Sequence, residues 1–218
     1  MHEDELEIPL ELVGDLVAGQ FPEWASLGLE GETLPAARIG EAADAAEDLA
    51  AFLAALQGMD TAGGPPNTSR GVPLSTRDAA VQRAIAALGG QVDAGAVRST
   101  WEAALQAEWH GPPAWLHGDL MPGNLLVVDR RLNAVIDFSS LCIGDPACDL
   151  MVAWMFLTAD SRPQFRSELG VDDAAWARGR GWALSCALIA IPYYTETNPT
   201  LASYARRTLA EVVADSGP

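Results

Sequence analysis

The polar side chains best suited to chemistry gather in one short stretch of this 218-residue chain. The loop His117–Asn124 reads H-G-D-L-M-P-G-N and contains Asp119, and Asp137 follows a later apolar run. An amide oxygen and a carboxylate are hard donors that suit Mg²⁺, which takes few protein ligands and fills its other positions with water and phosphate oxygens. A carboxylate beside such a metal–phosphate group is placed to act as the base for an attacking hydroxyl.

The elements around this stretch must bring Asn124 and Asp137 together for such chemistry to occur. Residues 125–128 and 133–136 are β-type apolar runs, and the four residues between them predict a hairpin. Asn124 stands at the start of this hairpin and Asp137 at its end, and facing residues of a hairpin lie about 4.5–5.5 Å apart. We therefore expect the two oxygen donors to converge, with Asp119 nearby on the preceding loop.

The rest of the chain shows helical periodicity. Apolar stripes and terminal signals predict a short helix from Pro9 and further helices at 41–57, from Ser75 or Thr76 to Leu88, from Asp93 to Leu105, and at 147–158, 161–168, 172–191 and 199–214. Residues 59–74 indicate an irregular loop, and residues 114–117 a short extended segment. The expected fold class is α+β, mostly helical, with a small β-hairpin insert where the chemistry is to be sought.

The composition excludes several classes of function. The chain has 30 acidic and 13 basic residues, a formal net charge of −17, so its surface repels nucleic acid and anionic lipid. All 13 basic residues are arginine, and the absence of lysine excludes a Walker A loop, a Schiff base and a catalytic lysine. Neither nucleic acid nor a membrane is an expected partner.

The same sequence predicts a cytoplasmic location. Residues 1–5 are acidic, opposite to the basic start of a secretory signal, and the longest apolar run, 183–192, is shorter than the roughly 20 residues of a membrane span. Cys142, Cys148 and Cys186 lack C-x-x-C spacing and are typical of reduced, buried thiols. The three histidines have no ligand-like spacing, which argues against a zinc site.

Three motifs in order, H-G-D-L-x-P-G-N-L-L, V-I-D-F and G-D-P-A-C-D-L, resemble the catalytic core of aminoglycoside phosphotransferases, small-molecule relatives of protein kinases. The resemblance implies a protein-kinase-like C-terminal lobe that uses ATP or GTP to phosphorylate a small-molecule hydroxyl, an antibiotic among the candidates. It implies Asp119 as the catalytic base, with Asn124 and Asp137 binding the nucleotide through Mg²⁺. His117, Asp145 and Asp149 would be structural residues near the site.

Each of these residues also has a purely structural interpretation. Asp119 can form a turn after a glycine, and Asn124 can occupy a left-handed turn. Asp145 before a proline is an ordinary helix N-cap, and Asp149 lies in the favourable first turn. We favour the structural interpretation for Asp145 and Asp149, and for His117 a core imidazole bonded to the backbone. For the set of Asp119, Asn124 and Asp137 together, coincidence is a poor explanation.

The N-terminal part departs from the family pattern. Family members place a β-rich nucleotide lobe, with a phosphate-binding lysine, between a first helix and a hinge that often resembles E-G-E-T-L. Here the first helix, expected through Leu29, is followed at once by Glu30–Leu34. We expect the lobe to be absent, 1–30 to be a helical segment and 31–218 the phosphotransferase domain. Arg38 could then replace the lysine, and the uncovered face could support homo-oligomers.

Three functions therefore compete. The first is a Mg²⁺- and nucleotide-dependent phosphotransferase, the second a non-catalytic kinase-like remnant that binds a partner or has no role, and the third a metal-dependent hydrolase, which is weaker because only two hard ligands are evident. The acceptor would lie against the C-terminal helices. Acidic residues there could attract a cationic acceptor or simply form a solvated face: Asp160, Glu168, Asp172, Asp173 and Glu196.

Overall fold

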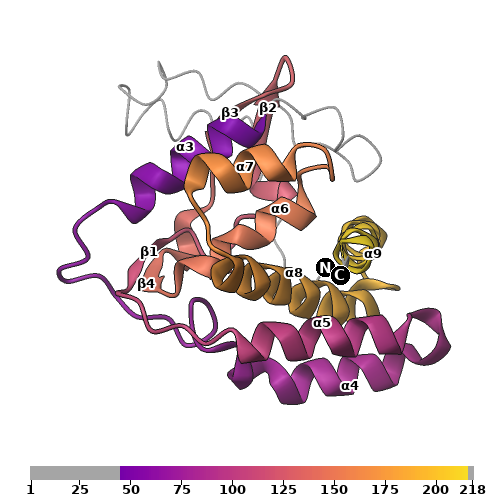
Figure 1. Ribbon diagram of the computed structural model, residues 1–218. Coiled ribbons are helices and arrows are strands. Elements are labelled where there is room, and N and C mark those ends of the chain that lie inside the picture. The colour runs from indigo at the N-terminus through magenta and orange to yellow at the C-terminus, as the bar shows by residue number, and fades with distance from the viewer. Residues whose placement is uncertain (1–44, 216–218) are drawn as a thin grey trace.

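The computed structural model describes residues 45–215, which form a mostly helical body with two small β-sheets (Figure 1). The α-helices are α3 (Ala45–Gln57), α4 (Asp78–Leu88), α5 (Ala94–Gln106), α6 (Val152–Met155), α7 (Arg162–Leu169), α8 (Asp173–Tyr194) and α9 (Pro199–Ala214). Short 3₁₀ segments are η2 (Leu74–Arg77), η3 (Gly89–Gln91), η4 (Pro122–Asn124), η5 (Phe138–Ser140) and η6 (Pro146–Met151). The strands are β1 (Ala114–Leu116), β2 (Leu125–Val128), β3 (Arg131–Val135) and β4 (Cys142–Gly144). The mostly helical α+β class with a small hairpin is confirmed.

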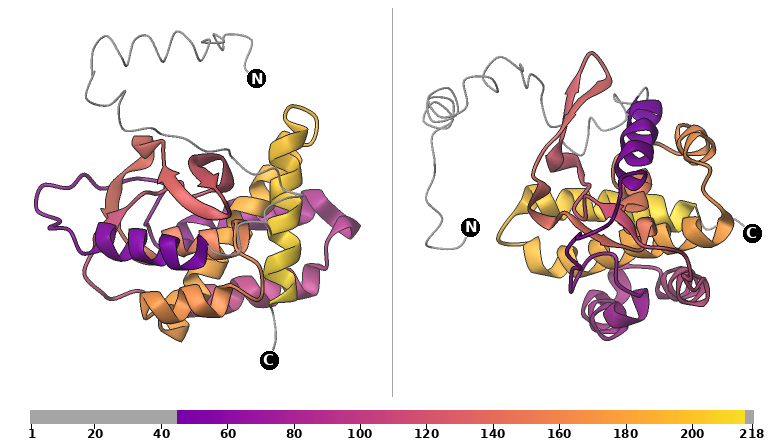
Figure 2. Two further views of the ribbon diagram at one scale, coloured as in Figure 1. Left: turned by 90° about the horizontal axis from the view of Figure 1, so that it is seen from above. Right: turned by 90° about the vertical axis from the view of Figure 1, so that its left-hand side faces the viewer.

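Strands β2 and β3 form the predicted antiparallel hairpin, which projects from the helical body in the right-hand view of Figure 2. Its turn is shorter than expected, because Asp129 and Arg130 both adopt positive φ and pairing resumes at Arg131. At the open end the Ile136 N–H donates to the Asn124 carbonyl over 3.0 Å. The backbone therefore brings Asn124 close to the residue before Asp137.

A second antiparallel sheet joins β1 to β4, with Trp115 opposite Ile143. The loop before η2 is fastened to β4 at two points: Ile143 N–H donates to the Pro65 carbonyl and Asp145 N–H to the Gly71 carbonyl, each over 2.9 Å. The irregular loop predicted for 59–74 is thus held firmly, although it has little regular structure of its own.

Helix α8 lies at the centre of the helical body, between η6 on one side and α4 and α5 on the other, and α9 packs against it (Figure 1). The side chains of Trp101, Trp154 and Trp182 are fully buried in this region. The expected apolar stripe of α3 is also buried, with Leu49 and Leu53 completely inaccessible to solvent. Burial of these large side chains is the main favourable contribution to folding.

Several predicted helix boundaries were wrong. Ser75 and Thr76 do not cap an α-helix; they lie inside η2, and α4 begins at Asp78 after an N-cap, Arg77, that makes no side-chain capping bond. The helix predicted at 147–158 begins as 3₁₀ helix and is α-helical only in α6. Helix α8 was predicted to end at residue 191, but it continues through Pro192 to Tyr194.

Other expectations lie outside the described residues: the helix from Pro9, the 1–30 segment, the hinge at Glu30–Leu34, Arg38 and the absence of a nucleotide lobe. The boundary between 1–30 and 31–218 therefore stays a prediction. None of the described helices is both long enough and apolar enough to cross a bilayer. Cys142 and Cys148 are buried free thiols, whereas Cys186 is only half-buried.

Candidate active site

The loop that carries Asp119 is clamped from behind by a buried carboxylate. Asp149 accepts the backbone N–H groups of His117 (2.7 Å) and Gly118 (2.9 Å), one on each oxygen. Gly118 has a φ of +79°, and a Cβ there would lie 2.6 Å from the Ser140 carbonyl oxygen, so the close turn requires glycine. Burial raises the pKa of Asp149, and the two backbone hydrogen bonds lower it. The effect of burial is larger, so the pKa rises to about 6.

His117 is a buried spacer between this loop and the hairpin. Its Nε2 lies 2.9 Å from the Ile136 carbonyl oxygen, and the Asp119 N–H donates to Nδ1 over 3.3 Å. Because a carbonyl can only accept and an N–H can only donate, Nε2 carries the proton and Nδ1 accepts. The ring also packs edge-on against Phe138, with centroids 4.8 Å apart. His117 thus fixes the position of Asp119 relative to the hairpin.

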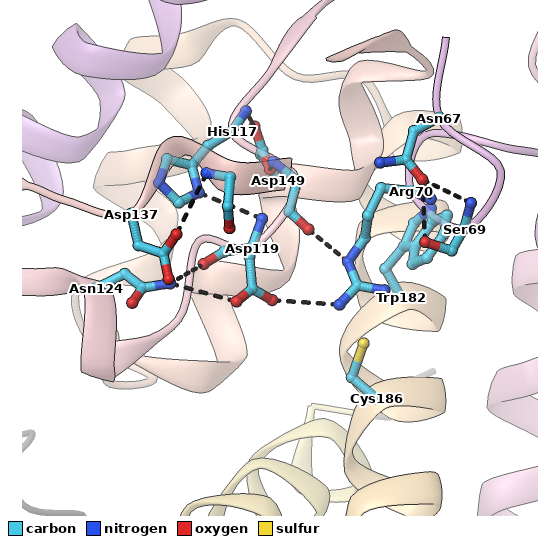
Figure 3. A network of polar contacts seen from close by, with 12 residues as sticks. Asn67, Ser69, Arg70, His117, Asp119, Asn124, Asp137, Asp149, Trp182 and Cys186 are labelled. Carbon is cyan, nitrogen blue, oxygen red and sulfur yellow. Dashed lines mark hydrogen bonds and ion pairs between the residues drawn. The ribbon is translucent and has the colours of Figure 1, made fainter. Parts of the chain in front are cut away.

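Asp119 is held by both of its oxygens (Figure 3). Oδ1 lies 3.2 Å from Nη2 of Arg70, and Oδ2 accepts a 3.3 Å hydrogen bond from Nδ2 of Asn124. The same Asn124 nitrogen donates to the Asp119 carbonyl over 2.8 Å. The carboxylate keeps 26% of its side-chain surface exposed, so it is accessible to a second molecule while its orientation is fixed.

Asn124 and Asp137 are neighbours at the base of the hairpin in Figure 3. Since Asn124 turns its amide nitrogen to Asp119, its amide oxygen is left for another ligand. Asp137 is exposed and adopts left-handed backbone angles (φ 60°, ψ 70°), uncommon for a residue other than glycine and typical of functional sites. The Ser139 side chain and N–H lower the pKa of Asp137, which favours the ionised form.

These two side chains supply an amide oxygen and a carboxylate, the donor types that suit Mg²⁺. Among residues 45–215, no group of three or more His, Cys, Asp or Glu side chains could hold a metal. A closed all-protein metal cage is therefore not formed by the described residues. An open site, in which water and phosphate oxygens complete the shell, fits this donor set.

Arg70 is the site residue that the sequence analysis missed. It lies on the loop before η2, and besides its ion pair with Asp119 it donates from Nε to the Gly118 carbonyl over 2.5 Å. Next to it, Gly71 has a φ of +61°, and a Cβ there would overlap Leu116 Cδ1. Nothing in the local sequence marks this arginine, because its contacts depend on a partner 49 residues away.

Asp145 lies behind the site and belongs to the fold. It accepts from the Ala147 N–H at the start of η6 (3.0 Å), and it forms a buried ion pair with Arg178 of α8, with 2.7 Å between Oδ2 and Nε. Neither Asp145 nor Asp149 lines the cavity in front of Asp119. Both side chains position backbone rather than contact a ligand.

A cavity of about 510 Å³ opens in front of Asp119. It is enclosed by the loop after Asp119, by η2, and by the facing sides of α8 and α9, and its lining includes Arg70, Arg77, Tyr193, Tyr194 and Tyr204. The acidic residues considered for a cationic acceptor, Asp160, Glu168, Asp172, Asp173 and Glu196, do not line it. Two of them have structural contacts, since Asp172 caps α8 and Asp173 pairs with Arg166.

Comparison with known proteins gives a consistent result. A model of the phosphotransferase enzyme family matches residues 27–182. The GDP complex of wild-type aminoglycoside 2'-phosphotransferase-IIIa superposes with a TM-score of 0.56 at 18% identity, over 87% of this chain and 69% of that one. The GDP and kanamycin complex of APH(2")-IIIa gives 0.57 at 19%, over 87% and 70%. Macrolide 2'-phosphotransferase type I gives 0.52 at 20%, over 78% and 57%. These likenesses show a shared fold, and no curated protein is significantly similar in sequence.

Proposed function

The chain belongs to the phosphotransferase enzyme family, and from this membership we propose that it transfers the γ-phosphoryl group of ATP or GTP to a hydroxyl of a small molecule. The observation that carries the proposal is the position of Asp119, oriented by Arg70 and Asn124 at the wall of a cavity of about 510 Å³. A cavity of this size suits a small-molecule ligand.

In the proposed reaction the acceptor hydroxyl occupies the cavity and donates its hydrogen bond to the Asp119 carboxylate. The acceptor oxygen forms a bond to the γ-phosphorus as the bond from that phosphorus to the β–γ bridging oxygen breaks, and the nucleoside diphosphate leaves. Asp119 receives the hydroxyl proton. Because such transition states are loose, the main task of the side chain is to position the hydroxyl.

Asn124 and Asp137 would hold Mg²⁺ at the base of the hairpin. When bound, the ion neutralises charge on the nucleotide phosphates. The fit rests on the donor set: one amide oxygen turned away from Asp119 and one exposed carboxylate whose pKa is lowered by Ser139. The proposed base, Asp119, and the two proposed metal ligands, Asn124 and Asp137, thus lie next to one another at the base of the hairpin.

The test is a thermal-shift titration of the full chain with Mg–ATP and Mg–GTP. We expect either nucleotide to raise the melting temperature, and Asp137→Ala to abolish the rise because it removes the oxygen ligand altogether. Asp129→Ala is the matched control, since Asp129 is an exposed carboxylate with positive φ at the far end of the same hairpin. No shift with millimolar Mg–nucleotide in the unsubstituted chain would contradict the proposal.

A second candidate is a non-catalytic kinase-like module, favoured by one observation: the sequence has no lysine to pair with the phosphates. It predicts that the chain transfers phosphate to no acceptor. Phosphate transfer measured with γ-labelled ATP across aminoglycoside, macrolide and other alcohols separates the two. Transfer that is lost in Asp119→Asn would exclude the second candidate, since a general base contributes about 10²–10⁴-fold.

A further inference from the structure

The described residues that line the cavity in front of Asp119 carry more positive than negative charge. Arg70 and Arg77 contribute cations and Asp119 contributes the one carboxylate among them, in a chain whose formal net charge is −17. The charge of Arg70 is paired with Asp119 at 3.2 Å. The charge of Arg77 therefore makes the net charge of these lining residues positive.

Arg77 is partly buried, and within residues 45–215 its side chain contacts uncharged groups. Its Nε donates to Ser185 Oγ over 2.8 Å, and Nη2 lies 3.9 Å from Cys186 Sγ. The guanidinium also sits over the Trp182 ring, 5.0 Å from its centroid. None of these contacts with the described residues is a carboxylate, so in this part of the chain the positive charge faces the cavity without an acidic partner and suits an anionic ligand.

The remaining cavity wall is largely apolar and aromatic. Its side chains come mainly from α8, α9 and the segment before α6, and they include Met121, Met151, Met155, Ile189, Tyr193 and Leu201. Methionines adapt to irregular ligand shapes, and tyrosines present a large apolar face with one polar tip. This lining suits a ligand with an apolar body rather than one with many charged amines.

We propose that the acceptor is an alcohol with an apolar body and an anionic group, such as a carboxylate, that is bound by Arg77. The inference rests on the proposed function, because it takes this cavity as the acceptor site. A polycationic acceptor would place ammonium groups beside an unneutralised guanidinium, which costs affinity through like-charge repulsion.

The test uses four probes and isothermal titration calorimetry without nucleotide. Cholate, its methyl ester and its 24-amino analogue share one hydroxylated apolar skeleton and differ in end-group charge, and kanamycin serves as the polycation. Cholate is used below its micelle concentration. We expect cholate to bind about tenfold or more tightly than the ester, as for a charge-assisted hydrogen bond. The amine and kanamycin should bind most weakly.

Arginine variants identify the group responsible. Arg77→Gln should remove the preference for cholate over its ester, whereas Arg77→Lys, which keeps the charge, should retain part of it. Arg98→Gln is the matched control, because Arg98 is exposed on α5, bonds to Gln82 and does not line the cavity. Circular dichroism establishes that each variant is folded before titration.

The possible results separate the inference from the function on which it rests. Tighter binding of the amine or of kanamycin, no binding of any probe, or an unchanged cholate preference in folded Arg77→Gln would each overturn the inference. If kanamycin is phosphorylated but cholate does not bind, the phosphotransferase function stands and the anionic acceptor is wrong. If cholate binds through Arg77 but no acceptor is phosphorylated, the cavity assignment stands and the function fails.

Discussion

Arg70 and Asn124 hold Asp119 from two sides, and only Asn124 belongs to the same sequence motif as Asp119. Arg70 reaches the site from a loop with no sequence signal, yet it bonds both to Oδ1 of Asp119 and to the Gly118 carbonyl. The orientation of the carboxylate therefore depends on a residue outside the motif His117–Asn124. In a reaction that relies on positioning, such a contact affects the rate directly.

We expect Arg70→Gln to lower kcat by about 10²-fold with a much smaller change in the KM for nucleotide, since misplacing a reacting group by about 1 Å can cost that much. Arg70→Lys should recover part of the rate, because it keeps the charge but not the two-point geometry. Steady-state kinetics with Arg98→Gln as control measure the effect. An equal loss in both variants and in the control would show that Arg70 has no specific role.

The buried Asp149 predicts a pH dependence of stability. Its pKa is raised from the ordinary value to about 6 by burial, so the folded state binds this proton more tightly than the unfolded state. The contribution of the group to the free energy of unfolding therefore falls as the pH rises from about 4 to about 6, and is constant above about 7.

Urea denaturation between pH 4 and pH 8 tests this. The difference in unfolding free energy between the unsubstituted chain and Asp149→Asn should fall over that pH interval. Asp93→Asn is the control variant, because Asp93 also accepts two backbone N–H groups but is exposed. If the difference in unfolding free energy for Asp149→Asn does not change with pH, burial does not raise the pKa of this carboxyl.

The sequence singled out the residues of the motifs but not the arginines around them. Asp119, Asn124 and Asp137 could be singled out because their spacing around a hairpin is local, and the roles assigned to them stay proposals. Arg70 and Arg77 could not, since their contacts with Asp119 and Ser185 span 49 and 108 residues. Pairings over such distances follow from the tertiary fold and leave no periodic pattern.

The loop from 59 to 74 has little regular structure, yet it positions Arg70 beside Asp119. Gly71 and Gly144 bring its backbone against β4, and a Cβ at Gly71 would lie 3.1 Å from Gly144 Cα. This close approach fixes the residue before it, Arg70, and hence Asp119. A loop can therefore be rigid without regular structure when its backbone is bonded and its neighbours leave no space.

Gly71→Ala should destabilise the fold by about 2 kcal/mol or more, from the sum of left-handed strain and steric overlap. Gly63→Ala in the same loop is the control, because Gly63 also has positive φ (78°) but a Cβ there meets no atom within 4 Å, so only about 1 kcal/mol of strain is expected. Chemical denaturation measures both. Equal losses would show that the close approach is not needed.

Element types were easier to predict than their ends. The helices α3, α4, α5 and α9 lie where the sequence predicted helices, and the side chains of Asp93 and Asn198 accept hydrogen bonds from the N–H groups of the first turn of α5 and α9. Strand β4 was missed because its three residues pair with β1, a contact that local patterning cannot reveal. The end predicted for α8, at residue 191, was wrong, because the helix continues to Tyr194.

For the whole molecule, the dominant property is the formal net charge of −17. Repulsion among the negatively charged side chains opposes the compact state. Salt screens this repulsion, because the Debye length falls from about 10 Å at 0.1 M salt to about 3 Å at 1 M. We expect the melting temperature to rise between about 0.02 and 0.5 M NaCl, although exposed ion pairs such as Arg131–Asp48 weaken. Differential scanning calorimetry measures this, with equal osmolarity of sucrose as control. A fall in melting temperature would mean that ion pairs outweigh repulsion.

The expected association of copies is also a property of the whole molecule and stays a prediction. It depends on the N-terminal 44 residues, which lie outside the described structure. Light scattering of the full chain decides it, and a monomer at all concentrations would contradict the expectation.

Different segments hold Asp119 and enclose the cavity. Arg70 and Asn124 belong to loops around the β-strands, whereas Tyr193, Leu201 and Tyr204 belong to α8 and α9. A randomised library restricted to those three helical positions would therefore vary the cavity wall while leaving Asp119, Arg70 and Asn124 unchanged. Such an arrangement would let new selectivities evolve, in the laboratory or in nature, from a few substitutions in two helices.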